Sequence, residues 1–260
     1  MNLGLKDKTA LVIGASRGLG AAIALGLAAE GATVFAAARS VEKIEAWANA
    51  LPQGSGIVLP NSLDLGNLKS VDHLADRLLA KGGVDIVINN TGGPPPASAV
   101  EASRADWLIQ FEMMAANLFH LTGRLLPPMR ARRWGRIITL ASSGVEQPIP
   151  RLALSNGIRS AIVGWSKTLA DEVAADGITV NVLLPGRIHT QRVDELDASA
   201  AKRFDRNLAD VAAASAASIP LGRYGRPEEF ADVAVFLASE RASYITGSKI
   251  RVDGGAIRAI

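Results

Sequence analysis

The residues with the clearest chemical signature are three glycines spaced G-x-x-x-G-x-G within Gly14–Gly20. They follow the apolar run Thr9–Ile13 and precede an Ala-rich run, so the pattern predicts a strand, a tight turn and a helix. Glycine lets backbone N–H groups approach a ligand closely, and a helix N-terminus favours an anion. We therefore expect this turn to bind the pyrophosphate of a dinucleotide. The residues expected to contact it are Gly14, Ser16, Arg17, Gly18, Leu19 and Gly20.

The residues after the second apolar run, Thr33–Ala37, indicate whether NAD(H) or NADP(H) binds. The run continues as Ala-Arg-Ser, without an acidic residue. An acidic residue at this place accepts hydrogen bonds from the adenosine ribose and repels a 2′-phosphate. Arg39, together with Arg17, can instead form a bidentate clamp on that phosphate. We expect NADP(H) as the cofactor; two ordinary solvated arginines at turn ends are the competing interpretation.

The elements that must position these residues alternate along the whole chain. Expected strands are Thr9–Ile13, Thr33–Ala37, Ile57–Leu59, Val84–Asn89, Arg136–Ala141, Ile178–Leu184 and Lys249–Val252. Expected helices are Leu19–Ala29, Val41–Ala50, Leu68–Ala80, Arg104–Arg132, Ser155–Ala175 and Pro227–Ala238. Such alternation is typical of an α/β protein with a doubly wound parallel sheet, here of about seven strands, and helices on both faces. With no Pro/Gly/Ser linker, residues 1–260 are expected to form a single Rossmann-type domain, with 186–218 beyond a strand's carboxyl end.

Composition excludes several classes of site. The chain has no cysteine, which removes disulfides, thiolate catalysis and Cys-ligated metals, and its three histidines are widely separated, so no metal is expected. Lys+Arg exceed Asp+Glu by only 28 to 25, and the densest basic stretch, Met129–Arg136, holds four arginines, so no nucleic-acid partner is expected. Without a segment apolar and long enough to span a bilayer, we expect no membrane association and a cytoplasmic location.

Several further segments occur in a recognisable order. They read N-N-T-G at 89–92, D-L at 64–65, P-G-x-I-x-T at 185–190, P-L-G-R at 220–223 and V-D-G-G at 252–255. With these, nearly the whole chain resembles the short-chain dehydrogenase/reductase family, and its C-terminal half is similar to 3-oxoacyl-acyl-carrier-protein reductases. The resemblance implies a homotetramer and further cofactor contacts. Those contacts are Asp64 and Leu65 near adenine, Asn90 and Gly92, and Pro185, Gly186, Ile188 and Thr190 near nicotinamide.

The family's proton relay of Asn, Ser, Tyr and Lys is matched only in part. Alignment from the G-R-I-I segment at 135–138 places Ser142 at the catalytic serine, Ser155 at the tyrosine and Arg159 at the lysine. Met114 stands at the asparagine, although Asn117 lies one turn further on. No shifted alignment recovers the tyrosine, because the chain's two tyrosines both lie in the C-terminal segment, at 224 and 244.

These replacements change the available chemistry. A serine hydroxyl cannot donate a proton near neutral pH as the family's tyrosine does. The Arg159 guanidinium cannot trade protons either, but it can hold ribose oxygens, a developing oxyanion or a substrate carboxylate. Ser155 and Arg159 share one helix face, where they could act together. The alternative for each residue is that its side chain merely packs or faces solvent. His189 could supply a proton, but a loop histidine that points to water is the favoured interpretation.

The expected function is therefore NADP(H)-dependent oxidation or reduction of an alcohol or carbonyl, with an atypical active site formed by Ser142, Ser155 and Arg159. The expected partner is a small-molecule substrate, and Arg159 would suit an anionic one. Two alternatives remain open. One is a dinucleotide-binding protein without redox turnover, acting as a sensor or assembly partner. The other is an enzyme of the same fold with non-redox chemistry such as elimination. A screen of NADPH oxidation beside a binding titration separates them.

Overall fold

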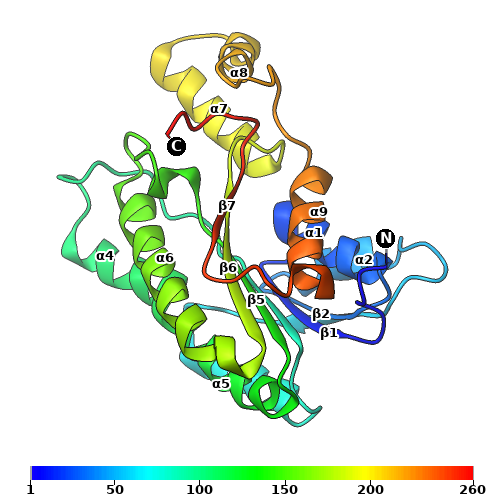
Figure 1. Cartoon of the computed structure of the whole chain (residues 1–260). Helices are drawn as coiled ribbons and strands as arrows, with labels where there is room; N and C mark the ends of the chain where they lie inside the picture. The colour runs from blue at the N-terminus through cyan, green and yellow to red at the C-terminus, as the bar shows by residue number, and fades with distance from the viewer. Residues whose placement is uncertain (1, 260) are drawn as a thin grey trace.

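A seven-stranded sheet runs through residues 2–259, the part of the chain that the computed structural model describes (Figure 1). The strands are β1 (Thr9–Ile13), β2 (Thr33–Ala38), β3 (Val58–Ser62), β4 (Ile86–Asn89), β5 (Gly135–Leu140), β6 (Ile178–Pro185) and β7 (Lys249–Val252). Their order is β3-β2-β1-β4-β5-β6-β7, and every neighbouring pair is parallel. The expected α/β fold with a doubly wound parallel sheet is confirmed.

One or more helices connect each pair of consecutive strands. They are α1 (Gly18–Ala29), α2 (Val41–Ala48), α3 (Leu68–Leu79), α4 (Arg104–Phe111), α5 (Asn117–Arg132), α6 (Ala153–Val173), α7 (Gln191–Phe204), α8 (Leu208–Ala217) and α9 (Pro227–Ala238). One π-helical turn, η1 (Glu112–Ala116), and three 3-10 turns, η2 (Ser143–Val145), η3 (Ala174–Asp176) and η4 (Glu240–Ala242), complete the described elements.

The central strands are apolar on both faces because helices cover both. Every residue of β4 and β5 is buried. On one face Val12, Val34 and Ile86 pack beneath α1 and α9, and on the other Leu11, Val87 and Ile137 pack beneath α3, α5 and α6. These two apolar layers fix the register that brings all the strand ends to one edge.

Most expected strands and helices match the structure to within two residues at each end, and two differ by more. The strand expected over Ile57–Leu59 extends to Ser62, past Pro60; β3 is at the edge of the sheet, where a residue without an N–H group is tolerated. The single helix expected over Arg104–Arg132 is wrong, because η1 interrupts it. Within that turn Met114 is fully buried in a small cluster with residues of α6, so tertiary packing sets a feature that helical periodicity does not encode.

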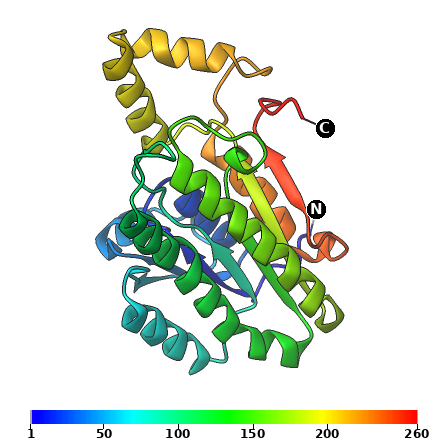
Figure 2. The ribbon, with the colours of Figure 1, turned by 90° about the vertical axis from the view of Figure 1, so that its left-hand side faces the viewer.

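The segment after β6 forms α7 and α8, which stand beyond the carboxyl end of the strand and away from the main body (Figures 1 and 2). This is the place expected for residues 186–218. No residue of α8 is buried, so its Ala-rich face lacks the cover that most of the other helices receive. Among residues 2–259, no helix is both long and apolar enough to cross a membrane.

The contact between α1 and α9 depends on a glycine. A Cβ built on Gly26 would lie 2.9 Å from Val235 Cγ2, whereas one on Gly164 of α6 would meet no atom within 4 Å. Alanine is better than glycine in an open helix interior by about 0.5–1 kcal/mol. We therefore expect Gly164→Ala to raise the free energy of unfolding by that amount and Gly26→Ala to lower it. Urea denaturation measures both, and equal gains would contradict the close α1–α9 approach.

Candidate functional site

The glycine turn after β1 is shaped by close approach of two strands. Because β1 lies between β2 and β4, the sheet's order reverses there, which is where open α/β sheets bind ligands. Gly14 and Gly18 have φ of +67° and +59°, the left-handed region that favours glycine. A Cβ on Gly20 would collide with the Gly14 carbonyl oxygen and lie 2.8 Å from Asn90 Nδ2. Asn90 Nδ2 donates to that same carbonyl at 3.3 Å, so the end of β4 fixes the turn.

A tryptophan supports the turn from the other side. Trp47 Nε1, on α2, donates to the Ala15 carbonyl at 3.1 Å. Sequence reasoning missed this residue; one signal was available, because a tryptophan in a short amphipathic helix needs a partner for its N–H group. The turn is therefore held by hydrogen bonds from both α2 and the end of β4.

The loop after β3 is tied to the start of α5. Asp64 Oδ1 accepts from the Gly66 N–H group at 3.0 Å, and the Leu65 carbonyl accepts from Asn117 Nδ2 at 2.8 Å. Asn117 is buried and begins α5 directly after the π-helical turn, whereas Met114 is fully buried among apolar side chains. Of these two positions Asn117 therefore carries the polar function, as a support for the 64–65 loop.

Arg159 is a buried cation at the carboxyl ends of β4 and β5. Its side chain lies on α6 and is 7% exposed as a residue. Nη1 donates to the Leu140 carbonyl at 2.8 Å and Nη2 to the Thr91 carbonyl at 3.4 Å. Burial, with a smaller contribution from the nearby charge of Arg192, lowers the pKa of the Arg159 guanidinium to about 10. The group is cationic at neutral pH.

The two serines lie on the segments that carry or contact this cation, one just after Leu140 and the other on α6. Ser142 follows the end of β5, and its Oγ accepts from the Gly144 N–H group at 3.0 Å. Ser155 is buried on the same helix face as Arg159, four residues earlier, so the interpretation of Ser155 and Arg159 as solvent-facing residues is excluded. Thr91 Oγ1 is buried and has no hydrogen-bond partner within residues 2–259. Hydroxyl groups and one cation thus gather at a single edge of the sheet.

The turn after β6 faces the glycine turn. A Cβ on Gly186 would lie 2.6 Å from Asp253 Cα, so this glycine is required by the backbone of the C-terminal segment. Ile188 is buried, and a Cβ on Gly18 would lie 3.6 Å from the Thr190 methyl group. The residues expected on the nicotinamide side are thus close to those expected on the pyrophosphate side.

Helix α7 is linked to the glycine turn by charge. Glu195 Oε1 lies 3.3 Å from Arg17 Nη1, and its other oxygen lies 3.6 Å from Arg192 Nη1. The Arg192 guanidinium also lies near Gly93, in the loop after β4. Arg39 is exposed directly after β2, as expected. Arg192 and Glu195 were not identified from the sequence, because only the fold brings α7 to this edge.

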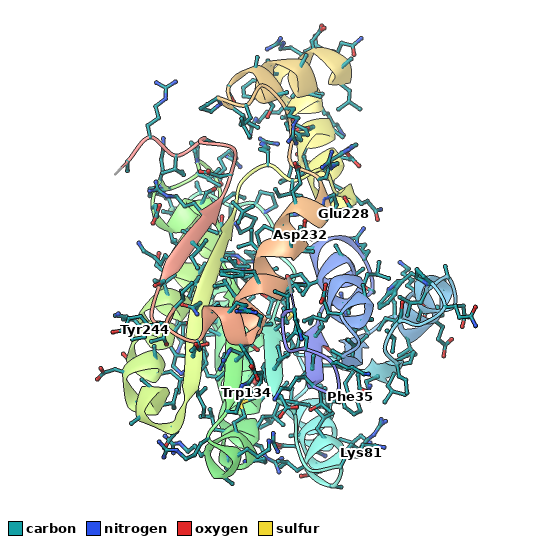
Figure 3. The ribbon with its side chains drawn as sticks, turned by 45° about the vertical axis from the view of Figure 1, so that its right-hand side comes forward. Phe35, Lys81, Trp134, Glu228, Asp232 and Tyr244 are labelled. Atoms are coloured by element: carbon teal, nitrogen blue, oxygen red, sulfur yellow. The ribbon has the colours of Figure 1, made fainter. Side chains whose placement is uncertain are left out.

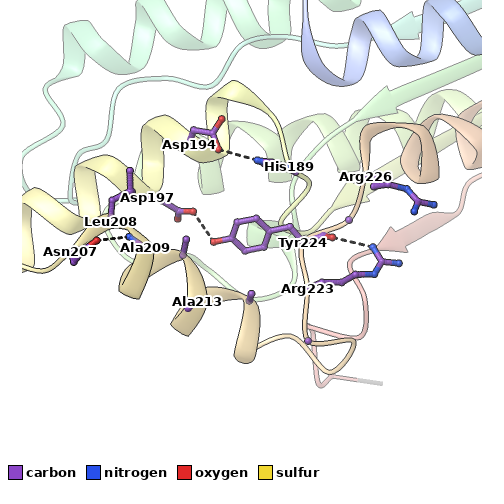
Figure 4. Close-up of a pocket in the computed structure, with 14 residues that line it drawn as sticks. His189, Asp194, Asp197, Asn207, Leu208, Ala209, Ala213, Arg223, Tyr224 and Arg226 are labelled. Atoms are coloured by element: carbon purple, nitrogen blue, oxygen red, sulfur yellow. Dashed lines mark hydrogen bonds and ion pairs between the residues drawn. The ribbon is translucent and has the colours of Figure 1, made fainter.

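A cavity of about 840 Å³, called the outer cavity below, is lined by Asp194 and Asp197 of α7 (Figure 4). The Ala-rich face of α8 and the loop 222–226 line it together with His189, whose Nε2 lies 3.5 Å from Asp194. Tyr224 Oη donates to Asp197 Oδ2 at 2.7 Å, and Arg187 lies 2.6 Å from Asp197 Oδ1. Burial raises the pKa of Tyr224. His189 and Tyr224 therefore belong to this cavity, whereas Thr190 faces the glycine turn.

Comparison with known proteins agrees with this architecture. A family model described as enoyl-(acyl carrier protein) reductase matches residues 14–256. The chain is 36% identical over 255 residues to the 3-oxoacyl-(acyl-carrier-protein) reductase FabG of Escherichia coli (strain K12), covering 97% of this chain and 98% of the relative. The chain belongs to the short-chain dehydrogenase/reductase family. Against the 3-oxoacyl-(acyl-carrier-protein) reductase FabG of Thermotoga maritima it is 31% identical, covering 97% of this chain and 99% of that relative.

Solved structures of reductases share the fold over their whole length. The L-sorbose reductase from Gluconobacter frateurii, complexed with NADPH and L-sorbose, superposes with a TM-score of 0.93 at 34% identity, with all of both chains covered. YwfH, an NADPH-dependent reductase involved in bacilysin biosynthesis, superposes with a TM-score of 0.91 at 30% identity, covering 98% of this chain and all of that one. The short-chain dehydrogenase/reductase fold thus extends over both the glycine turn and the segment with α7 and α8.

The two tyrosines offer a matched test of the outer cavity. Removing the Tyr224 hydroxyl leaves the buried Asp197 with one partner fewer, which we expect to lower the free energy of unfolding by about 1–3 kcal/mol in Tyr224→Phe. Tyr244 lies fully exposed at the outer edge of the molecule (Figure 3), so Tyr244→Phe should change nothing. Urea titrations of both variants measure this, and equal stability would contradict the Tyr224–Asp197 bond.

Proposed function

We propose that this protein is an NADP(H)-dependent oxidoreductase that interconverts a carbonyl and an alcohol, within one domain over residues 1–260, at a site built on Ser142, Ser155 and Arg159. The observation that carries the proposal is a buried guanidinium bonded only to backbone carbonyls among residues 2–259, beside two serine hydroxyls. A buried cation without an acidic partner is costly to fold and is characteristic of a functional site. The NADPH-dependent reductases among the structural neighbours support the assignment.

The residues present fit a dinucleotide. The crowded backbone at Gly14 and Gly20 leaves no room for side chains there, whereas a Cβ on Gly92, in the loop after β4, would meet no atom within 4 Å, so space is open beside that loop. Arg17 and Arg39 would hold a 2′-phosphate. When bound, NADPH supplies a hydride. The remaining contacts proposed are Ser16, Gly18, Leu19, Asp64, Leu65, Asn90, Pro185, Gly186, Ile188, Thr190 and the Arg159 guanidinium.

The proposed chemistry differs from that of a Tyr–Lys relay. Ser155 stands where the alignment expects the tyrosine, and Arg159 where it expects the lysine. When hydride reaches a carbonyl carbon, the carbonyl oxygen becomes negative. Arg159 stabilises that oxygen by charge, Ser142 donates a hydrogen bond to it, and the proton that completes the alcohol comes from water. His189 is a poor source, because its 69%-exposed imidazole pairs with Asp194 in the outer cavity.

This arrangement favours anionic substrates. Removing a positioned general acid typically lowers a rate by about 10²–10⁴, so simple ketones should react slowly. A carboxylate or a stabilised oxyanion gains from the charge of Arg159 and from Arg192, whose guanidinium is near enough to lower the pKa of Arg159. We therefore propose a small carbonyl substrate that carries a carboxylate.

A second candidate function is dinucleotide binding without redox turnover, in a sensing or assembly role. It is favoured by the positions of the tyrosines, because Tyr224 lines the outer cavity and Tyr244 is fully exposed. A screen of NADPH oxidation against ketones, aldehydes, oxoacyl thioesters and oxo acids, beside a binding titration, separates the two functions. Binding without turnover of any of them would favour the second.

The proposed cofactor preference can be tested at Arg39. This arginine is exposed directly after β2 with no acid in its place, so NADPH should bind more tightly than NADH. Arg39→Asp removes one cation and adds a charge that repels the 2′-phosphate, so the preference should reverse. Fluorescence titration with both cofactors measures it. If NADH binds as tightly as NADPH to the parent protein, the proposed clamp is wrong.

The role of Arg159 can be tested by kinetics. Because the cation is the active form and its pKa is about 10, turnover of the best oxo acid should be flat in pH from neutral to about 9 and fall above about 10. Arg159→Ala should lower kcat/KM by about 10²–10³, the cost of losing one oxyanion donor. The matched control is Arg77→Ala, which removes an exposed arginine on α3 and should leave the rate unchanged.

A second variant addresses the alignment itself. Ser155→Tyr combined with Arg159→Lys would restore the residues of the usual relay, so it should create activity on simple ketones that the parent lacks. Unchanged turnover and unchanged NADPH affinity in Arg159→Ala would show that the assigned role is wrong.

A homotetramer is proposed for the assembly. Helix α4 has no buried residue, yet Leu108, Ile109 and Phe111 are among the exposed large apolar side chains. Covering such a surface is a common reason for symmetric association. Light scattering at micromolar protein should give about four times the chain mass, and a monomer mass would contradict the proposal.

A further inference from the structure

Glu195 occupies a position that the cofactor assignment does not explain. It lies on α7, and its carboxylate meets Arg17 of the glycine turn at 3.3 Å. Arg17 precedes α1 in an extended backbone conformation, with φ of −164° and ψ of 172°, and its guanidinium reaches α7. The ion pair therefore joins the helix that follows β6 to the turn that follows β1.

A 2′-phosphate and Glu195 need the same guanidinium. A phosphate held by Arg17 would place two like-charged groups on one cation, and the carboxylate would repel the phosphate. NADH carries no such phosphate and leaves the ion pair in place. The cost of the competition therefore falls on NADP(H) alone.

Glu195 has an alternative partner on its own helix. Its Oε2 already lies 3.6 Å from Arg192 Nη1, three residues earlier, so release from Arg17 leaves the carboxylate paired. Arg192 in turn lies near Gly93 and close enough to influence Arg159. When Glu195 leaves Arg17 and pairs with Arg192, the charge around Arg192 changes, and Arg192 lies near Arg159, the proposed catalytic cation.

We propose that Glu195 is a cofactor-specificity residue, whose carboxylate holds Arg17 in the free protein and is displaced toward Arg192 by the 2′-phosphate of NADP(H). The inference rests on the proposed role of Arg17 in cofactor binding. By reciprocity, NADP(H) loosens the contact between α7 and the glycine turn, whereas NADH does not. The native carboxylate thus reduces the NADPH preference below what the two arginines alone would give.

The test compares Glu195→Gln with the parent protein by isothermal titration with NADPH, NADH, 2′,5′-ADP and 5′-AMP. Both side chains at Arg17 and Glu195 are about half exposed, and an exposed ion pair changes an equilibrium constant by at most about fivefold. We expect Kd to fall about two- to fivefold for the two ligands with a 2′-phosphate and to stay constant for the two without it. In the Arg17→Gln background the effect should disappear, which a double-mutant cycle quantifies.

The matched control is Asp194→Asn, which removes the same charge from the adjacent position of α7, where the carboxylate pairs with His189. It should leave all four dissociation constants unchanged. Equal tightening in both variants, or tightening for NADH as well, would show a general charge effect and overturn the inference. If the parent protein prefers NADPH through Arg17 but Glu195→Gln changes no dissociation constant, this inference alone is overturned. If the parent protein shows no preference for NADPH, the cofactor assignment is overturned as well.

Discussion

A guanidinium enclosed at the carboxyl edge of a parallel sheet is the constraint on which the candidate site depends. Arg159 donates to the carbonyl groups of Leu140 and Thr91, which lie at the ends of β5 and β4. Burying a cation without an acid is unfavourable unless its donors are satisfied, so the strand ends must stay where their carbonyls can accept. Hence Arg159 adds a polar link between α6 and the ends of β4 and β5, which backbone pairing and apolar packing already hold together, and Ser142 and Ser155 lie on the same elements.

The edge that Arg159 organises is continuous with the glycine turn through β4. Asn90, one residue before Thr91, donates to the Gly14 carbonyl, so the same short loop touches both the cation and the turn. Gly20 must then be a glycine because that carbonyl and the Asn90 amide fill the space of a Cβ. The proposed binding turn and the proposed catalytic cation are therefore joined through one loop, and a shift of the loop after β4 would disturb both.

Much of this arrangement follows from the sequence, and the rest does not for identifiable reasons. The bounds of three elements were predicted to the residue: Thr9–Ile13, Lys249–Val252 and Pro227–Ala238. Local signals mark them, namely the period of the apolar residues, flanking glycines and a proline at the start of the helix. The π-helical turn that ends before Asn117 was not, because it arises from packing of Met114 against α6. The support from Trp47 is likewise a contact between distant segments: the sequence indicates that the indole N–H group needs a partner, but not that the Ala15 carbonyl is that partner.

Helix α7 shows how neighbouring residues acquire separate tasks. Thr190 faces the glycine turn, while His189, one residue earlier, faces the outer cavity with Asp194. On the helix itself Asp194 and Glu195 differ by one position and so point about 100° apart, one carboxylate toward His189 and the other toward Arg17. The sequence places a histidine beside the expected nicotinamide contact, but the backbone turns its imidazole away. For that reason a titratable group next to a motif is not yet a catalytic acid, and the proposed chemistry relies instead on the fixed charge of the buried Arg159.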